Sequence, residues 1–161
     1  MTFKGGYLTQ KETQIWNLRK KIDNQSEIAR KLGVSRQAIS LSLISIETKM
    51  EKTFNEIIDA NNLHALQINT IDGVMEAYSP AYNLPVIVSL SNTNGLKVWY
   101  LYEGNCEKCD LERKCRNELL EEAKEREVIL SSLDKKLEPT KLARIVFQRY
   151  INEGKHNDKE N

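Results

Sequence analysis

Residues 26–40 read SEIARKLGVSRQAIS and decide the fold of the first third of the chain. Two short helical patterns flank Gly33, a residue suited to the left-handed position that ends a helix. Ser35 then serves as the N-terminal cap of the next helix, whose first residues are Arg36 and Gln37. A helix that begins with hydrogen-bonding side chains raises the question of what those side chains contact.

A helix-turn-helix makes fixed demands on such a stretch, and the sequence meets them. The two helices cross closely, so a small residue is needed at the crossing, and Ala29 is small. Gly33 tolerates positive φ in the turn, and Val34 fills the turn from the apolar side. Ile39 anchors the second helix in the core, so its first turn is expected to face the major groove of DNA.

We expect the DNA-facing residues to fall into two groups. Side chains on the first turns of the reading helix contact base edges or the nearest phosphates: Ser35, Arg36, Gln37, Ser40 and Leu41. Basic side chains around them contact the phosphate backbone, which sets affinity but not sequence preference: Arg30, Lys31, Lys20 and Lys21. The alternative for each charge is a solvated surface position without a partner.

The segments YLTQKETQIWNLRKK (7–21) and NQSEIARKLGVSRQAIS (24–40) carry a family resemblance. Together they resemble the helix-turn-helix of sigma-factor region 4, of response-regulator output domains and of archaeal Tfx-type DNA-binding proteins. The resemblance implies DNA binding and a role in transcription. The segments GVMEAYSP (73–80) and NGLKVWYLYEGNCEKCDLERKC (94–115) look like the C-terminal part of archaeal regulators with this N-terminal module, which implies no particular ligand. Tfx-type proteins carry no cysteines there, so their targets are not carried over.

Helix boundaries around the motif follow from capping residues. Thr9 is expected to cap a first helix over 9–21, with Glu12 completing a capping box. Asn24 caps a second helix that ends at Gly33. The third helix runs from Ser35 to Asn61-Asn62 without an internal glycine or proline.

The third helix carries a long apolar stripe. Its members recur at helical spacing: Ile39, Leu43, Ile46, Met50, Phe54 and Ile57. A helix of twenty-odd residues spans about 33 Å and outruns a three-helix core. Its far half must therefore pack on the same helix of a second subunit, which favours a homodimer, or on the next part of its own chain.

After Asn62 the apolar period changes from helical to two, which indicates strands. LQINTIDGVMEAY (66–78) is a hairpin with Asp72-Gly73 suited to a two-residue turn, and VIVSLSNTNGLKVWYLY (86–102) repeats this around Asn94-Gly95. In the last strand we expect Leu96, Val98, Tyr100 and Tyr102 on one face and Lys97, Trp99 and Leu101 on the other. We expect an antiparallel sheet of three or four strands with one face covered by a helix.

The C-terminal third is predicted to be helical. A charged helix covers roughly 116–130, with Leu119, Leu120, Ala123 and Ile129 apolar, and LEPTKLARIVFQRYI (137–151) forms the last helix with Pro139 near its start. The fold class is α+β: a helix-turn-helix module with a long helix over 1–60, an α+β dimerisation or sensing domain over 61–152, and a disordered tail over 153–161.

Cys106, Cys109 and Cys115 are the chain's three cysteines, and they form a C-x2-C-x5-C knuckle. Three thiolates with one further ligand hold zinc or an iron–sulfur cluster. The candidates for the fourth ligand are Asp110, Glu112, Glu103, His64 and His156, of which His64 or a nearby carboxylate is preferred because His156 lies in the tail. A partner subunit could supply the fourth ligand instead. The basic residues Lys108, Arg113 and Lys114 are expected to favour thiolates. A reversible disulfide or plain structural thiols are the alternatives.

Composition excludes several classes of protein. The net charge is only +1, but residues 1–45 hold eight basic and three acidic residues, so positive charge is concentrated at the motif. There is no apolar run long enough for a membrane span and no secretory signal, so we expect a cytoplasmic protein. We find no catalytic triad, phosphate-cradling loop or HExxH motif, and we expect a non-enzyme.

The sequence therefore predicts a sequence-specific, double-stranded DNA-binding regulator of transcription. The alternative is an adaptor that uses the same module to contact RNA polymerase or another protein without reading bases.

Overall fold

Helices, then strands, then helices follow one another in residues 6–101 and 106–151, which this computed structural model describes. The first helices are α1 (Gln10–Arg19), α2 (Gln25–Leu32) and α3 (Arg36–Asn61), and the strands are β1 (His64–Asn69), β2 (Val74–Ser79), β3 (Leu84–Ser91) and β4 (Gly95–Tyr100). The short 3-10 helix η1 (Cys106–Lys108), α4 (Glu112–Glu125), η2 (Asp134–Lys136), α5 (Pro139–Phe147) and η3 (Gln148–Tyr150) follow. The predicted α+β class is confirmed.

The predicted caps start the first three helices. Thr9 and Glu12 form the reciprocal capping box, with backbone-to-side-chain distances of 2.9 and 3.2 Å. Asn24 Oδ1 accepts hydrogen bonds from the backbone N–H groups at 26 and 27. Ser35 Oγ accepts one from Ala38 N at 3.1 Å. Each cap satisfies N–H groups that have no partner inside the helix, which is why these short sequence signals located the helix starts.

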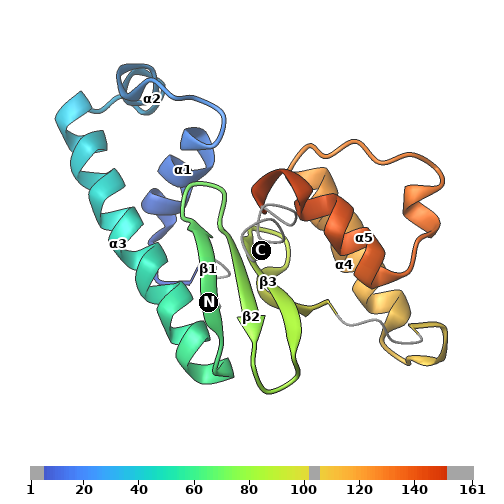
Figure 1. Cartoon of the computed structure of the whole chain (residues 1–161). Helices are drawn as coiled ribbons and strands as arrows, with labels where there is room; N and C mark the ends of the chain where they lie inside the picture. Colours follow the sequence, from blue (N-terminus) through green and yellow to red (C-terminus); the bar gives the residue numbers. More distant parts are fainter. Residues whose placement is uncertain (1–5, 102–105, 152–161) are drawn as a thin grey trace, which may run out of the picture.

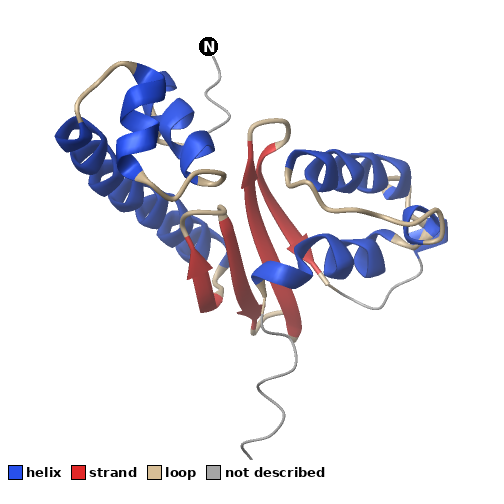
Figure 2. Cartoon of the chain, turned by 90° about the horizontal axis from the view of Figure 1, so that it is seen from above, coloured by secondary structure: helices blue, strands red, loops and turns tan. Residues whose placement is uncertain are grey.

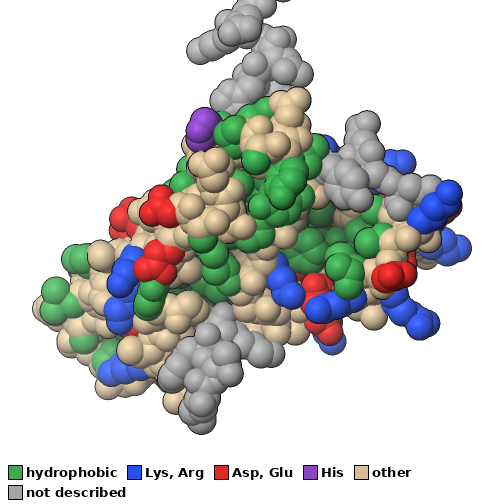
Figure 3. Space-filling model, turned by 90° about the horizontal axis from the view of Figure 1, so that it is seen from below, with side chains coloured by type: hydrophobic (Ala, Val, Ile, Leu, Met, Phe, Trp, Pro, Cys, Tyr) green, Lys and Arg blue, Asp and Glu red, His purple; other side chains and the backbone are tan. Residues whose placement is uncertain are grey.

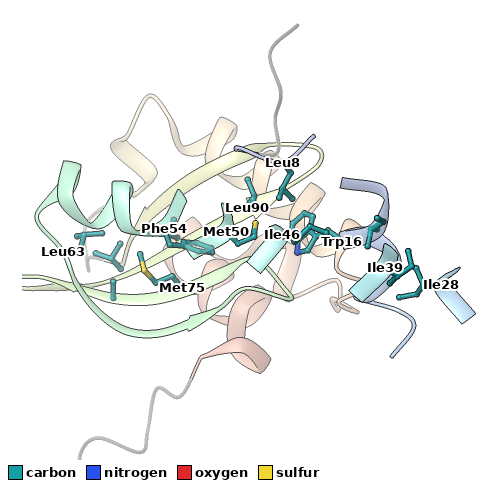
Figure 4. Close-up of a cluster of buried hydrophobic side chains, with 14 of the residues drawn as sticks. Leu8, Trp16, Ile28, Ile39, Ile46, Met50, Phe54, Leu63, Met75 and Leu90 are labelled. Atoms are coloured by element: carbon teal, nitrogen blue, oxygen red, sulfur yellow. The ribbon is translucent and has the colours of Figure 1, made fainter. Parts of the chain in front are cut away.

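Helix α3 packs along the sheet of its own chain. Ile46, Met50 and Phe54 are buried on α3 and share a hydrophobic core with Met75 of β2 and Leu90 of β3 (Figure 4). Of the two options for the apolar stripe, packing within the chain is therefore the one observed. The stripe is covered, so it no longer gives a reason to expect a homodimer.

The four strands form one antiparallel sheet in the order β1-β2-β3-β4. Both hairpins are present, but the two-residue turns that we expected are wrong. Asn69 pairs with Val74, which leaves four residues in the first turn. Ser91 pairs with Gly95, which leaves three residues in the second.

Packing of Trp16 from α1 explains the shape of the first turn. The indole Nε1 donates to the Thr70 carbonyl at 3.0 Å, and Gly73 has φ +66°. A Cβ on Gly73 would lie 2.8 Å from the Trp16 ring and 2.9 Å from the Leu90 carbonyl oxygen. The turn is therefore fitted around a side chain from 54 residues earlier, a contact that no local turn rule contains.

The sheet buries one face on a helix, as stability requires, and helices cover its other face as well. Figures 1 and 2 show α1, α2 and α3 on one side and α4 and α5 on the other. The alternation predicted for β4 is confirmed over 96–101, because Leu96, Val98 and Tyr100 pack into the core with α3. Tyr102 lies outside the described residues. Trp99 and Leu101 point the other way, into a second core with Leu119, Leu142 and Phe147. The result is three layers with two cores.

The charged helix is displaced from its predicted position. Helix α4 spans 112–125, not 116–130, because Glu127 adopts a left-handed φ of +56° and ends it. Val128 N then bonds back to the Ala123 carbonyl at 2.8 Å. Ile129 is consequently not a core residue of this helix but is 96% exposed.

The last helix is present, with Pro139 in its first turn as predicted, but α5 ends at Phe147 and the chain continues as the 3-10 helix η3 to Tyr150. The predicted disordered tail, 153–161, lies outside the described residues. None of the helices formed by residues 6–101 and 106–151 is both long and apolar enough to cross a lipid bilayer.

Candidate functional site

The junction of α2 and α3 has the geometry expected of a helix-turn-helix. Ala29 is buried at the crossing, and Gly33 has φ +65° with both ends of the turn tied by backbone hydrogen bonds. Val34 is half-buried against the first core, and Ile39 is fully buried in it. In Figure 1, α2 lies across the N-terminal end of α3. This arrangement holds the start of α3 in a fixed orientation.

The first turn of α3 faces solvent. Arg36 and Gln37 are exposed, as is Ser35, whose side chain caps the helix. One turn later Ser40 is half-buried and Leu41 is 69% exposed. No acidic residue lies in this first turn, so the positive end of the helix dipole is not offset by a local carboxylate. The surface offered is polar, with one apolar side chain.

The nine candidate DNA contacts separate into two groups in space. Arg30 and Lys31 are exposed on the last turn of α2. Within residues 6–101 and 106–151, neither they nor Arg36 form an ion pair. These three cations, with the first turns of α3, form what we term the reading surface: Arg30, Lys31, Ser35, Arg36, Gln37, Ser40 and Leu41.

Lys20 and Lys21 follow the C-terminal end of α1 and lie against residues at the ends of α4 and α5. Lys21 pairs with Glu127 at 3.0 Å. The Lys20 ammonium lies 3.3 Å above the Trp16 ring, and burial, followed by the nearby charge of Arg126, lowers its pKa to about 8. Both lysines line a cavity of about 310 Å³ together with Asp72, Arg126 and Arg149. Both lysines therefore form contacts within the chain, Lys20 with Trp16 and Lys21 with Glu127.

A buried ion pair that we did not predict lies behind this cavity. Arg126 and Glu122 are separated by 2.8 Å and are 5% and 0% exposed. Arg126 also donates to the carbonyls of Asp72 and Leu90, at 2.7 and 3.1 Å. Ser89 Oγ donates to Glu122 at 3.1 Å. The i, i+4 spacing of a Glu and an Arg was the available signal, but it is equally typical of an exposed helix face.

The three cysteines line one cavity of about 160 Å³ at the edge of the second core. Cys106 is buried, Cys115 is half-buried and Cys109 is exposed, and none is in a disulfide. Glu112 lines the same cavity, and Cys106 Sγ lies 4.0 Å from Thr140 Oγ1 of α5. Leu101, at the end of β4, and Pro139, at the start of α5, close its apolar side.

The environment of Cys115 does not favour a thiolate as we expected. Burial raises the pKa of this thiol, and electrostatic repulsion from Glu118 raises it further. Lys114 lowers it but has the smallest effect. These surroundings therefore favour the protonated form of the Cys115 thiol.

The candidates for a fourth metal ligand are distributed unevenly. Glu112 lines the cysteine cavity, whereas Asp110 and His64 are exposed, His64 at the start of β1. Figure 3, which colours histidine purple, shows such a side chain at the surface. Glu103 and His156 lie outside the described residues. In the described part of the chain, no three His, Cys, Asp or Glu side chains converge closely enough to hold a metal ion as they stand.

Comparisons with known proteins identify no relative of this chain. The resemblance to sigma region 4, response-regulator output domains and Tfx-type proteins rests on the quoted sequence motifs. No protein-family model matches this chain, and neither the curated proteins nor the solved structures contain a match.

Proposed function

We propose that this protein is a sequence-specific DNA-binding regulator of transcription that places the first turns of α3 in the major groove. The observation that carries the proposal is the reading surface: a polar, cation-flanked helix end that is exposed while its base is locked in the core. Ile28 and Ile39, both fully buried, fix that base. A rigid, solvent-facing helix N-terminus is what major-groove recognition requires.

Each side chain of the reading surface has a role that follows from its chemistry. Arg36 can donate two hydrogen bonds to guanine O6 and N7, and Gln37 can pair with adenine N6 and N7. Leu41 suits a thymine methyl group. Arg30 and Lys31, on the last turn of α2, are placed to contact phosphates, as is the hydroxyl of Ser35. We leave Lys20 and Lys21 out of this surface because their ammonium groups are engaged elsewhere.

The test begins by selecting binding sites for the full chain from random double-stranded DNA, followed by fluorescence anisotropy on the selected sequence. Gln37→Ala is expected to lower affinity for that sequence by about 1–3 kcal/mol and to relax the preference at one base position. The reason is that the lost contact is to a base edge, so non-specific DNA binding is unaffected.

Phosphate contacts give a different signature in the same assay. Lys31→Ala is expected to weaken binding to all sequences alike and to reduce the slope of log K against log salt by about 0.9. Lys124→Ala, an exposed lysine on α4, is the matched control and leaves the slope unchanged. Lys20→Ala is expected to behave like this control. A protein that selects no sequence, or variants that all lose affinity equally, would contradict the proposal.

One observation favours the adaptor as a second candidate. Leu41 and Ile44 on α3 are 69% and 61% exposed, and Ile71 in the first hairpin turn is 42% exposed. Exposed apolar side chains of this kind suit a protein partner such as RNA polymerase. An adaptor binds that partner with little salt dependence and shows no DNA affinity, so the same salt titration separates the two functions.

A further inference from the structure

We propose that Cys106, Cys109, Cys115 and Glu112 bind one thiophilic divalent metal ion, such as Zn²⁺, in the cysteine cavity. The proposal is independent of DNA binding. Its starting point is that every cysteine in the 161-residue chain lines the same cavity of about 160 Å³. Three thiols that face one small space can supply three of the four ligands of a tetrahedral zinc site.

Local backbone geometry brings the ligands together. Cys109 N donates to the Cys106 carbonyl at 3.0 Å in η1, and Glu112 N donates to the Cys109 carbonyl at 3.1 Å. Cys115 N donates to the Leu111 carbonyl at 2.9 Å and lies on the first turn of α4. Consecutive tight turns therefore compress the C-x2-C-x5-C spacing into one short segment, as a metal knuckle requires.

Glu112 is the fourth ligand because one of its oxygens is unoccupied. Arg116 contacts Glu112 Oε1 through both Nε and Nη2. Among the described residues, nothing donates to Oε2. Glu112 can therefore bind the ion through Oε2 while Arg116 holds Oε1, the kind of outer contact that orients a metal ligand. Arg116 is itself fixed by the Lys135 carbonyl at 3.0 Å.

The cavity lacks a cation of its own. Its lining is mainly apolar, including Leu101, Pro139 and Ala143, and no lysine or arginine of the described chain lines it. Three thiolates placed there would meet no basic side chain in the lining of the cavity, and a divalent ion would supply positive charge inside it. Binding displaces protons according to 3 R–SH + Zn²⁺ → Zn(S–R)₃⁻ + 3 H⁺, because thiolates are the ligands.

Binding of one ion requires the four side chains to move closer together. The four side chains line the cavity but do not yet converge on one point, and Cys109 is exposed to solvent. Recruitment of Cys109 by the ion would tie η1 to the start of α4, the two segments that supply the ligands. We therefore expect metal binding to stabilise the C-terminal layer.

The experiment uses the full chain, reduced and freed of metal. Titration with Zn²⁺ is expected to bind one ion per chain with release of protons. Substitution by Co²⁺ is expected to give thiolate-to-cobalt absorption and the visible bands of a tetrahedral ion. Cys109→Ser and Cys115→Ser are expected to abolish stoichiometric binding, and Glu112→Gln to weaken it by about 10-fold or more.

The matched control is Asp110→Asn, an exposed carboxylate two residues from Glu112, which is expected to bind like the parent chain. Because a cysteine variant could fail to fold, alkylation of the unmodified protein by iodoacetamide is measured as well. Zn²⁺ is expected to protect all three thiols. Absence of stoichiometric binding, binding that survives both cysteine substitutions, or thiols that react equally with and without Zn²⁺ would overturn the proposal.

Discussion

At the scale of single residues, Lys20 shows how tertiary contacts redefine a surface charge. The sequence places it in a basic run, KK at 20–21, typical of phosphate contacts. In the structure its ammonium lies over the Trp16 ring and is partly desolvated, which lowers its pKa from 10.5 to about 8. The neighbouring Lys21 keeps an ordinary exposed ion pair with Glu127.

This burial gives Lys20 a measurable effect on stability. The folded pKa is below the unfolded one, so the unfolded state binds more protons between pH 8 and 10.5. The cost of burying the charge is fully present below pH 8 and disappears as the pH rises to 10.5. Lys20→Met is expected to stabilise the protein by about 1–3 kcal/mol at pH 7, with the gain fading above pH 8.

Urea denaturation at pH 7 and at pH 10 measures this difference. Lys21→Met is the control, since an exposed ion pair contributes about 0–1 kcal/mol. A gain from Lys20→Met that is the same at both pH values would show that the burial of charge is not its cause.

At the scale of elements, two of the glycines with positive φ, Gly33 and Gly73, separate conformational strain from steric exclusion. Both have φ near +65°, but a Cβ on Gly33 would meet nothing within 4 Å. A Cβ on Gly73 would lie 2.8 Å from Trp16 and 2.9 Å from a backbone oxygen. At Gly33 only the left-handed backbone conformation calls for glycine. At Gly73 the close contact with Trp16 of α1 and with the sheet calls for glycine as well.

The pair makes a matched prediction. Gly33→Ala is expected to cost about 1–2 kcal/mol, the penalty for a left-handed L-residue. Gly73→Ala is expected to cost about 1–3 kcal/mol more, because Trp16 or the Leu90 carbonyl must also move. Thermal and urea denaturation of both variants test the difference. Equal costs would mean that the Trp16 contact around the hairpin is loose.

At the scale of the whole molecule, the C-terminal helices are joined to the sheet by the Arg126–Glu122 pair as well as by hydrophobic contacts. Arg126 bonds to backbone carbonyls in the β1–β2 turn and at the end of β3. Glu122 accepts from Ser89 in the middle of the sheet. One buried pair thus connects α4 to both hairpins.

Removal of one partner leaves the other charge buried. Arg126→Met is expected to destabilise the protein by about 3–5 kcal/mol, and adding Glu122→Leu is expected to restore part of that loss. Lys124→Met, an exposed position on the same helix, serves as the control and changes stability by less than about 0.5 kcal/mol. If the single and double variants are equally unstable in urea, the charge left by the single substitution is not the cause.

The sequence by itself determined the features that depend on near neighbours. Capping groups at Thr9, Asn24 and Ser35 and the left-handed Gly33 fix local hydrogen bonds, so the helix-turn-helix was predictable. The strand alternation at 96–101 was predictable for the same reason, since side chains on a strand alternate between its two faces.

Only the tertiary structure decided what covers each apolar face and which group each charged side chain contacts. The stripe of α3 could have faced a second subunit, and only the sheet's position shows that the chain itself buries it. The same holds for Lys20, for the Gly73 turn and for the cavity that gathers the cysteines with Glu112. Periodicity states that a face is apolar or a residue charged, but the packing of the folded chain selects its partner.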